Sequence, residues 1–130
     1  SIVGLNDVVN FLGWRDDVHD LISRSNIFVM PSGDEGVPNA AQEAMYLEIP
    51  VIATPVGGLP DVIKHNDTGW LLPVDDPDSW ACQILRCIND VDKRNTVRLK
   101  AADYAANNFG VEAWGKEYSE VLNATVEIKL

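Results

Sequence analysis

Apolar and polar positions along this chain form blocks that predict strands and helices in turn. Four apolar runs predict strands, over residues 8–13, 26–31, 50–54 and 69–73. Helical spacing and helix-start signals predict six helices, over residues 16–25, 37–47, a short one at Pro60, 78–90, 92–107 and 111–126. Strands that alternate with helices are typical of βαβ units, so the pattern predicts an α/β fold with a parallel sheet and helices on both faces.

Two glutamates, Glu35 and Glu43, are separated by seven residues across a loop and the helix that follows it. Pro38 suits the first position of this helix, because proline has a fixed φ and lacks an N–H. The loop follows a buried strand, and ligands of open α/β sheets bind at the carboxyl ends of strands. The free N–H groups and dipole of the helix N-terminus favour an anion there, typically a phosphate.

The spacing of the two carboxylates suggests what else such a ligand would carry. Glu43 lies about 8 Å along the helix, at 1.5 Å per residue, and an ionised carboxylate can accept from both hydroxyls of a ribose. Glu35 precedes the helix and can meet a group on the other side of the phosphate, so the spacing suits a nucleoside-diphosphate sugar. The spacing also fits a simpler interpretation, in which Glu35 complements the helix dipole and Glu43 is a solvated surface residue.

Length, composition and charge limit the function classes. A chain of 130 residues, 46% of them apolar, fits one domain with a sizeable core, and the net charge of −10 opposes binding to nucleic acid and anionic membranes. The N-terminus lacks a signal-peptide pattern, and no apolar stretch approaches the ~20 residues of a membrane span, so a cytoplasmic location is expected. Cys82 and Cys87 are too few and poorly placed for a disulfide framework or a zinc site, and both are expected to pack in the core.

Several other conspicuous residues favour structural interpretations. His19 is flanked by aspartates in a helix and is expected on the surface, and His65 lies in a polar turn. Trp80 is expected to anchor the core from an amphipathic helix. Asp61 at a helix start fits capping as well as a ligand role. The acidic stretch 75–78 is interrupted by proline and indicates a helix N-cap region in place of a metal loop.

The two glutamates belong to a longer series of motifs, which reads Ser32-Gly33-Asp34-Glu35-Gly36-Val37-Pro38-Asn39, Glu43-Ala44-Met45, Pro50-Val51-Ile52-Ala53-Thr54 and Gly57-Gly58-Leu59-Pro60-Asp61. In this order and at these intervals the motifs resemble the retaining glycosyltransferases of family four, GT-B enzymes with two Rossmann-like domains. The resemblance covers nearly the whole chain. One departure is Glu48, which stands where the family usually has a glycine at the end of the helix.

The resemblance implies roles for particular residues. Glu43 is expected to bind the ribose hydroxyls of the donor, and Glu35 is expected to contact the donor sugar, which makes it the candidate catalytic residue. The backbone that faces the sugar and diphosphate is expected to be that of Gly36, Val37, Pro38 and Asn39. Gly13 and Trp14 are expected near the nucleobase. No metal and no cofactor are implied, since the nucleotide-diphosphate sugar is the donor substrate.

The resemblance also implies that residues 1–130 are a partial domain. The C-terminal domain of a GT-B enzyme has six parallel strands in the order 3-2-1-4-5-6, and this chain corresponds to strands three to six. The N-terminal acceptor-binding domain and the cations that neutralise the diphosphate would lie elsewhere. We therefore expect the chain alone to be inactive, and we expect the strand at 9–13 either to pair directly with that at 27–31 or to leave a gap that another chain fills.

We interpret the chain as the nucleotide-sugar-binding part of a glycosyltransferase that acts with retention on a polysaccharide, glycolipid or other acceptor hydroxyl. The acceptor, and any membrane contact, would be bound through parts outside these residues. Two alternatives remain open. One is a non-catalytic nucleotide-sugar-binding or scaffold domain, and the other is a nucleotide-sugar epimerase of the same fold, which would need a histidine and carboxylates in a closed cleft. Ligand titration tests the first alternative, and product analysis tests the second.

Overall fold

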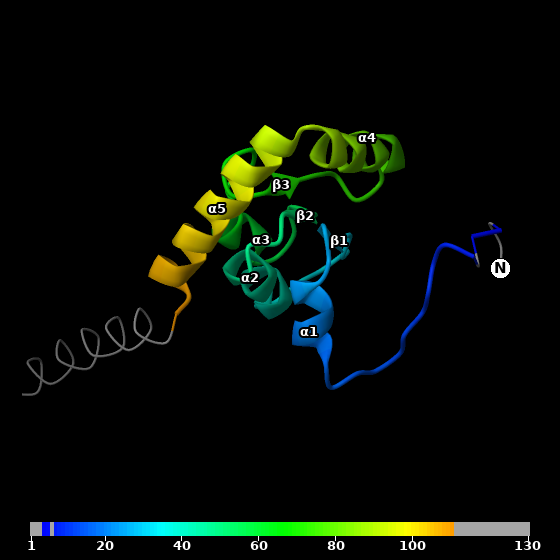
Figure 1. Cartoon of the computed structure of the whole chain (residues 1–130), viewed down its shortest axis with the longest axis horizontal. Helices are drawn as coiled ribbons and strands as arrows, with labels where there is room; N and C mark the ends of the chain where they lie inside the picture. Colours follow the sequence, from blue (N-terminus) through cyan, green and yellow to red (C-terminus); the bar gives the residue numbers. More distant parts are fainter. Residues whose placement is uncertain (1–3, 6, 111–130) are drawn as a thin grey trace, which may run out of the picture.

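The computed structural model describes residues 4, 5 and 7–110 and contains a parallel sheet of three strands (Figure 1). The strands β1 (Phe28–Met30), β2 (Val51–Ala53) and β3 (Trp70–Leu71) lie side by side in that order. Phe28 lies opposite Val51 and Ile52 opposite Trp70. Each connection between these parallel strands includes a helix, so the predicted α/β fold is confirmed.

Five helices complete the described part of the chain: α1 (Val18–Ser23), α2 (Asn39–Tyr46), α3 (Leu59–Val62), α4 (Pro77–Asn89) and α5 (Val91–Asn108). Each of them was predicted, although α1 is shorter than expected. The helix predicted over 111–126 lies outside the described residues. None of the helices between residues 4 and 110 is long and apolar enough to cross a membrane.

Helices cover both faces of the sheet. Alternate residues of β2 point to opposite sides, so each face has its own apolar cluster. Val51 and Ala53 face one apolar cluster, which buries side chains of α1, α2, α3 and the second half of α5. Ile52 faces the other, which comprises Ile52, Trp70, Trp80, Cys87 and Val97. The three β2 side chains are fully buried, which explains why this strand is apolar at every position.

The second cluster tests two predictions about single residues. Trp80 is buried as expected, and its indole Nε1 donates to the Pro73 carbonyl at 2.7 Å. Cys87 is also buried, and this burial raises the pKa of its thiol. The prediction that Cys82 packs in the core is wrong, because its side chain lies on the exposed side of α4.

The strand predicted over residues 8–13 does not form. This segment runs away from the sheet towards the N-terminus (Figure 1), and Phe11 is 96% exposed. Direct pairing with the strand at 27–31 is not seen among the described residues, since β1 pairs with β2 and has no strand of this chain on its other side. A strand needs a neighbouring backbone for its hydrogen bonds, and an apolar run alone does not supply one.

The end of α2 shows how Glu48 occupies a position where the family usually has glycine. The Ile49 N–H donates to the Ala44 carbonyl at 2.9 Å, and the Glu48 N–H donates to the Met45 carbonyl at 3.1 Å. This pair of bonds is a Schellman motif, in which the residue at the Glu48 position is left-handed. Glu48 has φ 59°, so it adopts the conformation that glycine favours. Its carboxylate Oε2 accepts from the Arg98 guanidinium at 2.5 Å, which ties the helix exit to α5.

Candidate functional site

The loop between β1 and α2 carries the predicted site and begins beside the end of β2. Buried Thr54, the residue after β2, donates from its hydroxyl to the Ser32 carbonyl at 2.6 Å. Its backbone N–H donates to the Met30 carbonyl at 3.2 Å. Thr54 therefore fixes the start of the loop at the carboxyl end of the sheet, which is the edge where ligands of such sheets bind.

The same loop packs against two glycines that follow β2. Gly57 has φ +54°, and a Cβ placed on it would lie 1.6 Å from the Glu35 carbonyl oxygen. A Cβ on Gly58 would lie 2.8 Å from the Gly36 carbonyl oxygen and 3.2 Å from Cδ of Pro38. The two loops therefore meet backbone to backbone, and a side chain at Gly57 cannot fit.

Sequence reasoning did not predict this contact. The motif series places Gly57 and Gly58 just before the short helix at Pro60 but gives no contact for them. Two adjacent glycines at the end of a buried strand are a signal of close backbone approach, although they do not identify the approaching segment. The structure shows that this segment is the one that carries Glu35.

The start of α2 differs in one detail from the prediction. Pro38 is the N-cap of the helix, with φ −81° and ψ 64°, and Asn39 is the first helical residue. The Pro38 carbonyl accepts from the Ala41 and Gln42 N–H groups at 3.1 and 3.2 Å, which starts the helical bonding pattern. Proline has no side-chain acceptor, so no side chain caps this end of α2 within the described residues. The Asn39 N–H donates to the Val37 carbonyl at 2.9 Å, so the helix start offers an anion its dipole and the N–H groups that remain.

Glu35 and Glu43 occupy different settings around this helix start. Glu35 lies in the loop, half-buried, where its own carbonyl packs against Gly57. Glu43 lies one turn into α2 on the face opposite the buried Ala41, Ala44 and Met45. Its side chain is 38% exposed, and its Oε1 lies 3.7 Å from Nε2 of His19 on α1. Neither carboxylate is buried in the core, so both can meet a ligand.

A groove of about 470 Å³ borders Glu43. It lies between α1, α2 and the end of α5, and its lining includes His19, Asn39, Gln42, Glu43, Tyr46 and Phe109. The polar groups come from one side of α2 and from α1, while α5 contributes apolar surface. A groove with a few convergent polar groups on an apolar wall is a common form of ligand site.

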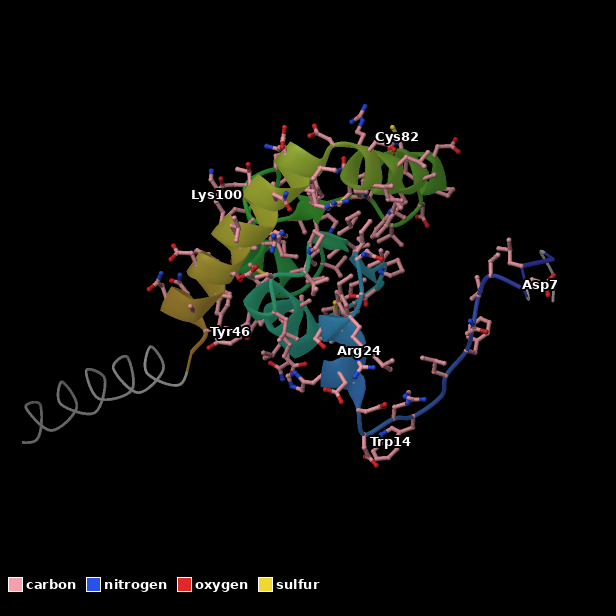
Figure 2. All side chains as sticks on the ribbon, viewed as in Figure 1. Asp7, Trp14, Arg24, Tyr46, Cys82 and Lys100 are labelled. Carbon is pink, nitrogen blue, oxygen red and sulfur yellow. The ribbon has the colours of Figure 1, made fainter. Side chains whose placement is uncertain are left out.

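The structure does not bring Gly13 and Trp14 together with these residues. They lie on the segment that leaves the body before α1, and Trp14 is 87% exposed (Figure 2). A nucleobase role for them stays a prediction. His19 is exposed as expected, but it also reaches Glu43, which the sequence did not indicate.

Two further residues have the structural roles that were predicted. The Nδ1 atom of His65 accepts from the Leu71 N–H at 3.0 Å, and so holds the turn before β3. Asp76 caps α4 by accepting from the N–H and hydroxyl of Ser79. These hydrogen bonds favour the ionised form and lower the pKa of the Asp76 carboxyl.

Comparison with known proteins agrees with this geometry. The profile of the family described as "Glycosyl transferases group 1" matches residues 1–90. N-acetyl-alpha-D-glucosaminyl L-malate synthase of Bacillus anthracis is 32% identical over 117 residues, which is 90% of this chain and 31% of the relative. The amylovoran biosynthesis glycosyltransferase AmsK of Erwinia amylovora is 36% identical over 126 residues, 91% of this chain and 31% of the relative. The chain thus spans about a third of the length of these relatives.

Solved structures show the same likeness. HepE of Anabaena, in complex with UDP-glucose, superposes with a TM-score of 0.87 at 28% identity, over 95% of this chain and 34% of HepE. Sucrose-phosphate synthase from Thermosynechococcus elongatus gives a TM-score of 0.80 at 32% identity, over 92% of this chain and 32% of the synthase. The fold is therefore similar to GT-B glycosyltransferase structures, as the sequence motifs implied. With the profile matching more than half of its residues, the chain belongs to the glycosyl transferases group 1 family.

Proposed function

We propose that this chain is the nucleotide-sugar-binding part of a retaining glycosyltransferase, from the C-terminal domain of a GT-B enzyme. The observation that carries the proposal is the loop of Glu35. It is held against Gly57 at the carboxyl edge of the sheet and leads into an uncapped helix whose next turn presents Glu43. The likeness to HepE, which was solved with UDP-glucose, supports the same ligand class here.

The proposed arrangement assigns each part of the ligand to a part of the site. The diphosphate lies at the N-terminus of α2, where the backbone from Gly36 to Asn39 faces it. Glu43 accepts hydrogen bonds from the ribose hydroxyls, and Glu35 contacts hydroxyls of the sugar. Gly13 and Trp14 serve the nucleobase. No metal or organic cofactor takes part in this proposal, because the nucleotide sugar is itself the substrate.

In the proposed reaction an acceptor hydroxyl attacks the anomeric carbon from the face from which the nucleotide diphosphate leaves. The protein contributes positioning and stabilises the charge on the departing diphosphate. The helix N-terminus supplies part of that stabilisation through its N–H groups. A covalent intermediate on Glu35 is not part of the proposal.

The whole enzyme is part of the proposal as well. Because the chain spans about a third of its relatives, we place the acceptor site and the cations that face the diphosphate in a longer protein. The acceptor would be a hydroxyl of a polysaccharide, a glycolipid or a similar molecule. The cytoplasmic location, and any membrane contact through other parts, belong to the same proposal. The chain alone would then bind donor weakly and transfer no sugar.

Thermal unfolding with a panel of nucleotides tests the donor site. UDP, GDP and ADP, and their glucose conjugates, are each added to the chain and the unfolding midpoint is measured. A ligand that binds the folded state raises stability by RT ln(1 + [L]/Kd), so one base should give a dose-dependent rise. UDP is the first expectation. No shift with any of the six compounds, either in this chain or in a protein that joins it to the rest of its domain, would contradict a donor site and favour a scaffold domain.

A further inference from the structure

His19 is the histidine beside Glu43, and it does not contact the ligand in the arrangement proposed above. It lies on α1, and its Nε2 is 3.7 Å from Oε1 of Glu43 on α2. Both side chains line the same groove of about 470 Å³. We infer that His19 is a positioning residue that holds the Glu43 carboxylate toward the groove, where the ribose hydroxyls of the nucleotide bind. The inference rests on the proposed function, which places the ribose at Glu43.

The geometry shows how His19 can act without blocking the ligand. An ionised carboxylate has about four lone-pair directions on its two oxygens. His19 approaches Oε1, and the remaining directions are enough for the two hydroxyls of a ribose. The separation of 3.7 Å exceeds a direct hydrogen bond, so the two groups attract one another through charge when the imidazole is protonated.

Because the side chains of His19 and Glu43 are exposed, an effect of His19 on ligand binding can be separated from an effect on folding stability. The His19 side chain is 70% exposed and that of Glu43 is 38% exposed. Ion pairs as exposed as this one contribute little to folding stability. Loss of His19 should therefore leave the unfolding midpoint nearly unchanged, while it changes the affinity for a ligand that uses both oxygens of Glu43.

Several acidic groups, one arginine and one phenol lie near His19. On α1 and just before it lie Asp16, Asp17 and Asp20, and Asp17 is held by Arg15. On α2 the groove presents Glu43 and the phenol of Tyr46, and the described end of α5 presents only Ala105, Phe109 and Gly110. Histidine is the side-chain type whose charge ordinarily changes between pH 5 and 8, and His19 is the only histidine among these groups. A pH series is therefore a direct probe of the pair.

The test compares UDP with 2′,3′-dideoxy-UDP, which lacks both ribose hydroxyls, by calorimetric titration at low salt between pH 6 and 8. The terminal phosphate titrates in both compounds, so the ratio of their dissociation constants cancels its contribution. In the unaltered chain this ratio should favour UDP more strongly at pH 6 than at pH 8, by about two- to fivefold, the size of an exposed ion pair. In His19→Gln the ratio should be the same at both pH values.

Two further variants make the outcome specific. His65→Gln removes the other histidine, which lies before β3, and should keep the pH dependence of the unaltered chain. Glu43→Ala should abolish the preference for UDP, and adding His19→Gln to it should have no further effect. A pH-independent ratio in the unaltered chain, or a ratio that rises with pH, would overturn the inference while UDP binding still supports the donor site. Failure of UDP to bind both the unaltered chain and a protein that joins it to the rest of its domain would overturn the inference and the donor site together.

Discussion

Substituting alanine for Gly57 is the sharpest test of how the site is built. The two loops at the edge of the sheet meet at this glycine, and its φ of +54° is in the left-handed region. The new Cβ would lie 1.6 Å from the Glu35 carbonyl oxygen and 2.6 Å from the carbonyl carbon. Both atoms belong to the backbone, so no side-chain rotation can relieve the overlap.

The size of the effect follows from two separate costs. A non-glycine residue in the left-handed region costs about 1 kcal/mol, and overpacking that displaces backbone costs about 1–3 kcal/mol. The loops would have to separate by about 2 Å to restore an ordinary van der Waals contact. We therefore expect Gly57→Ala to lower the free energy of unfolding by about 2–4 kcal/mol and to move Glu35 away from its place.

Urea unfolding followed by tryptophan fluorescence measures the change, because Trp70 and Trp80 are 3% and 8% exposed. Gly33→Ala is the matched control, since Gly33 lies in the partner loop, has no positive φ and has open space at its Cβ position. The control should change the free energy of unfolding by less than about 0.5 kcal/mol. If Gly57→Ala is as stable as the control, the close approach of the two loops is refuted.

Substitutions at three further positions test the site and the end of α2. Glu43→Ala should weaken UDP binding by about 1–3 kcal/mol in calorimetric titration, because it removes charged hydrogen bonds, and equal affinity of the unaltered chain for UDP and 2′-deoxy-UDP would contradict the ribose role. Glu35→Gln, in a protein that joins this chain to its acceptor domain, should depress sugar transfer and leave UDP affinity nearly unchanged; a similar loss of UDP affinity would contradict the sugar role. Both Glu48→Gly and Glu48→Ala lose the exposed Arg98 pair, but only Glu48→Gly relieves the left-handed strain, so the glycine variant should have the higher free energy of unfolding by about 1 kcal/mol in urea unfolding.

The order of the elements could be predicted because local patterns determine it. The apolar residues of β2 are buried on both faces of the sheet, and a run without polar positions is the local signature of that setting. The segment at 8–13 is also largely apolar, although Asn10 interrupts it, and it forms no strand among the described residues. Pairing depends on a neighbour that is distant in sequence, so the apolar character of a run does not by itself decide whether a strand forms.

The same distinction applies to the candidate site. The positions of Glu35 and Glu43 at a helix start follow from their spacing and from Pro38, which are local features. The contact of Gly57 with Glu35 and the approach of His19 to Glu43 join different elements, and their presence depends on how those elements pack. Spacing along the chain therefore identified the carboxylates but not the groups that hold them.

Different contacts hold the residues proposed for the two ends of the ligand. Those that hold α2 place Glu43. Its buried face of Ala41, Ala44 and Met45 packs in the same cluster as Ala101 and Ala105 of α5, and its exit is fixed by the Schellman motif. Glu43 is thus placed by the helix, whereas Glu35 is placed by the loop contact with Gly57. Displacing that loop should move Glu35 more than Glu43. If the proposed assignments hold, Gly57→Ala will weaken binding of UDP-glucose more than binding of UDP, and an equal loss for both would show that the loop also positions the helix.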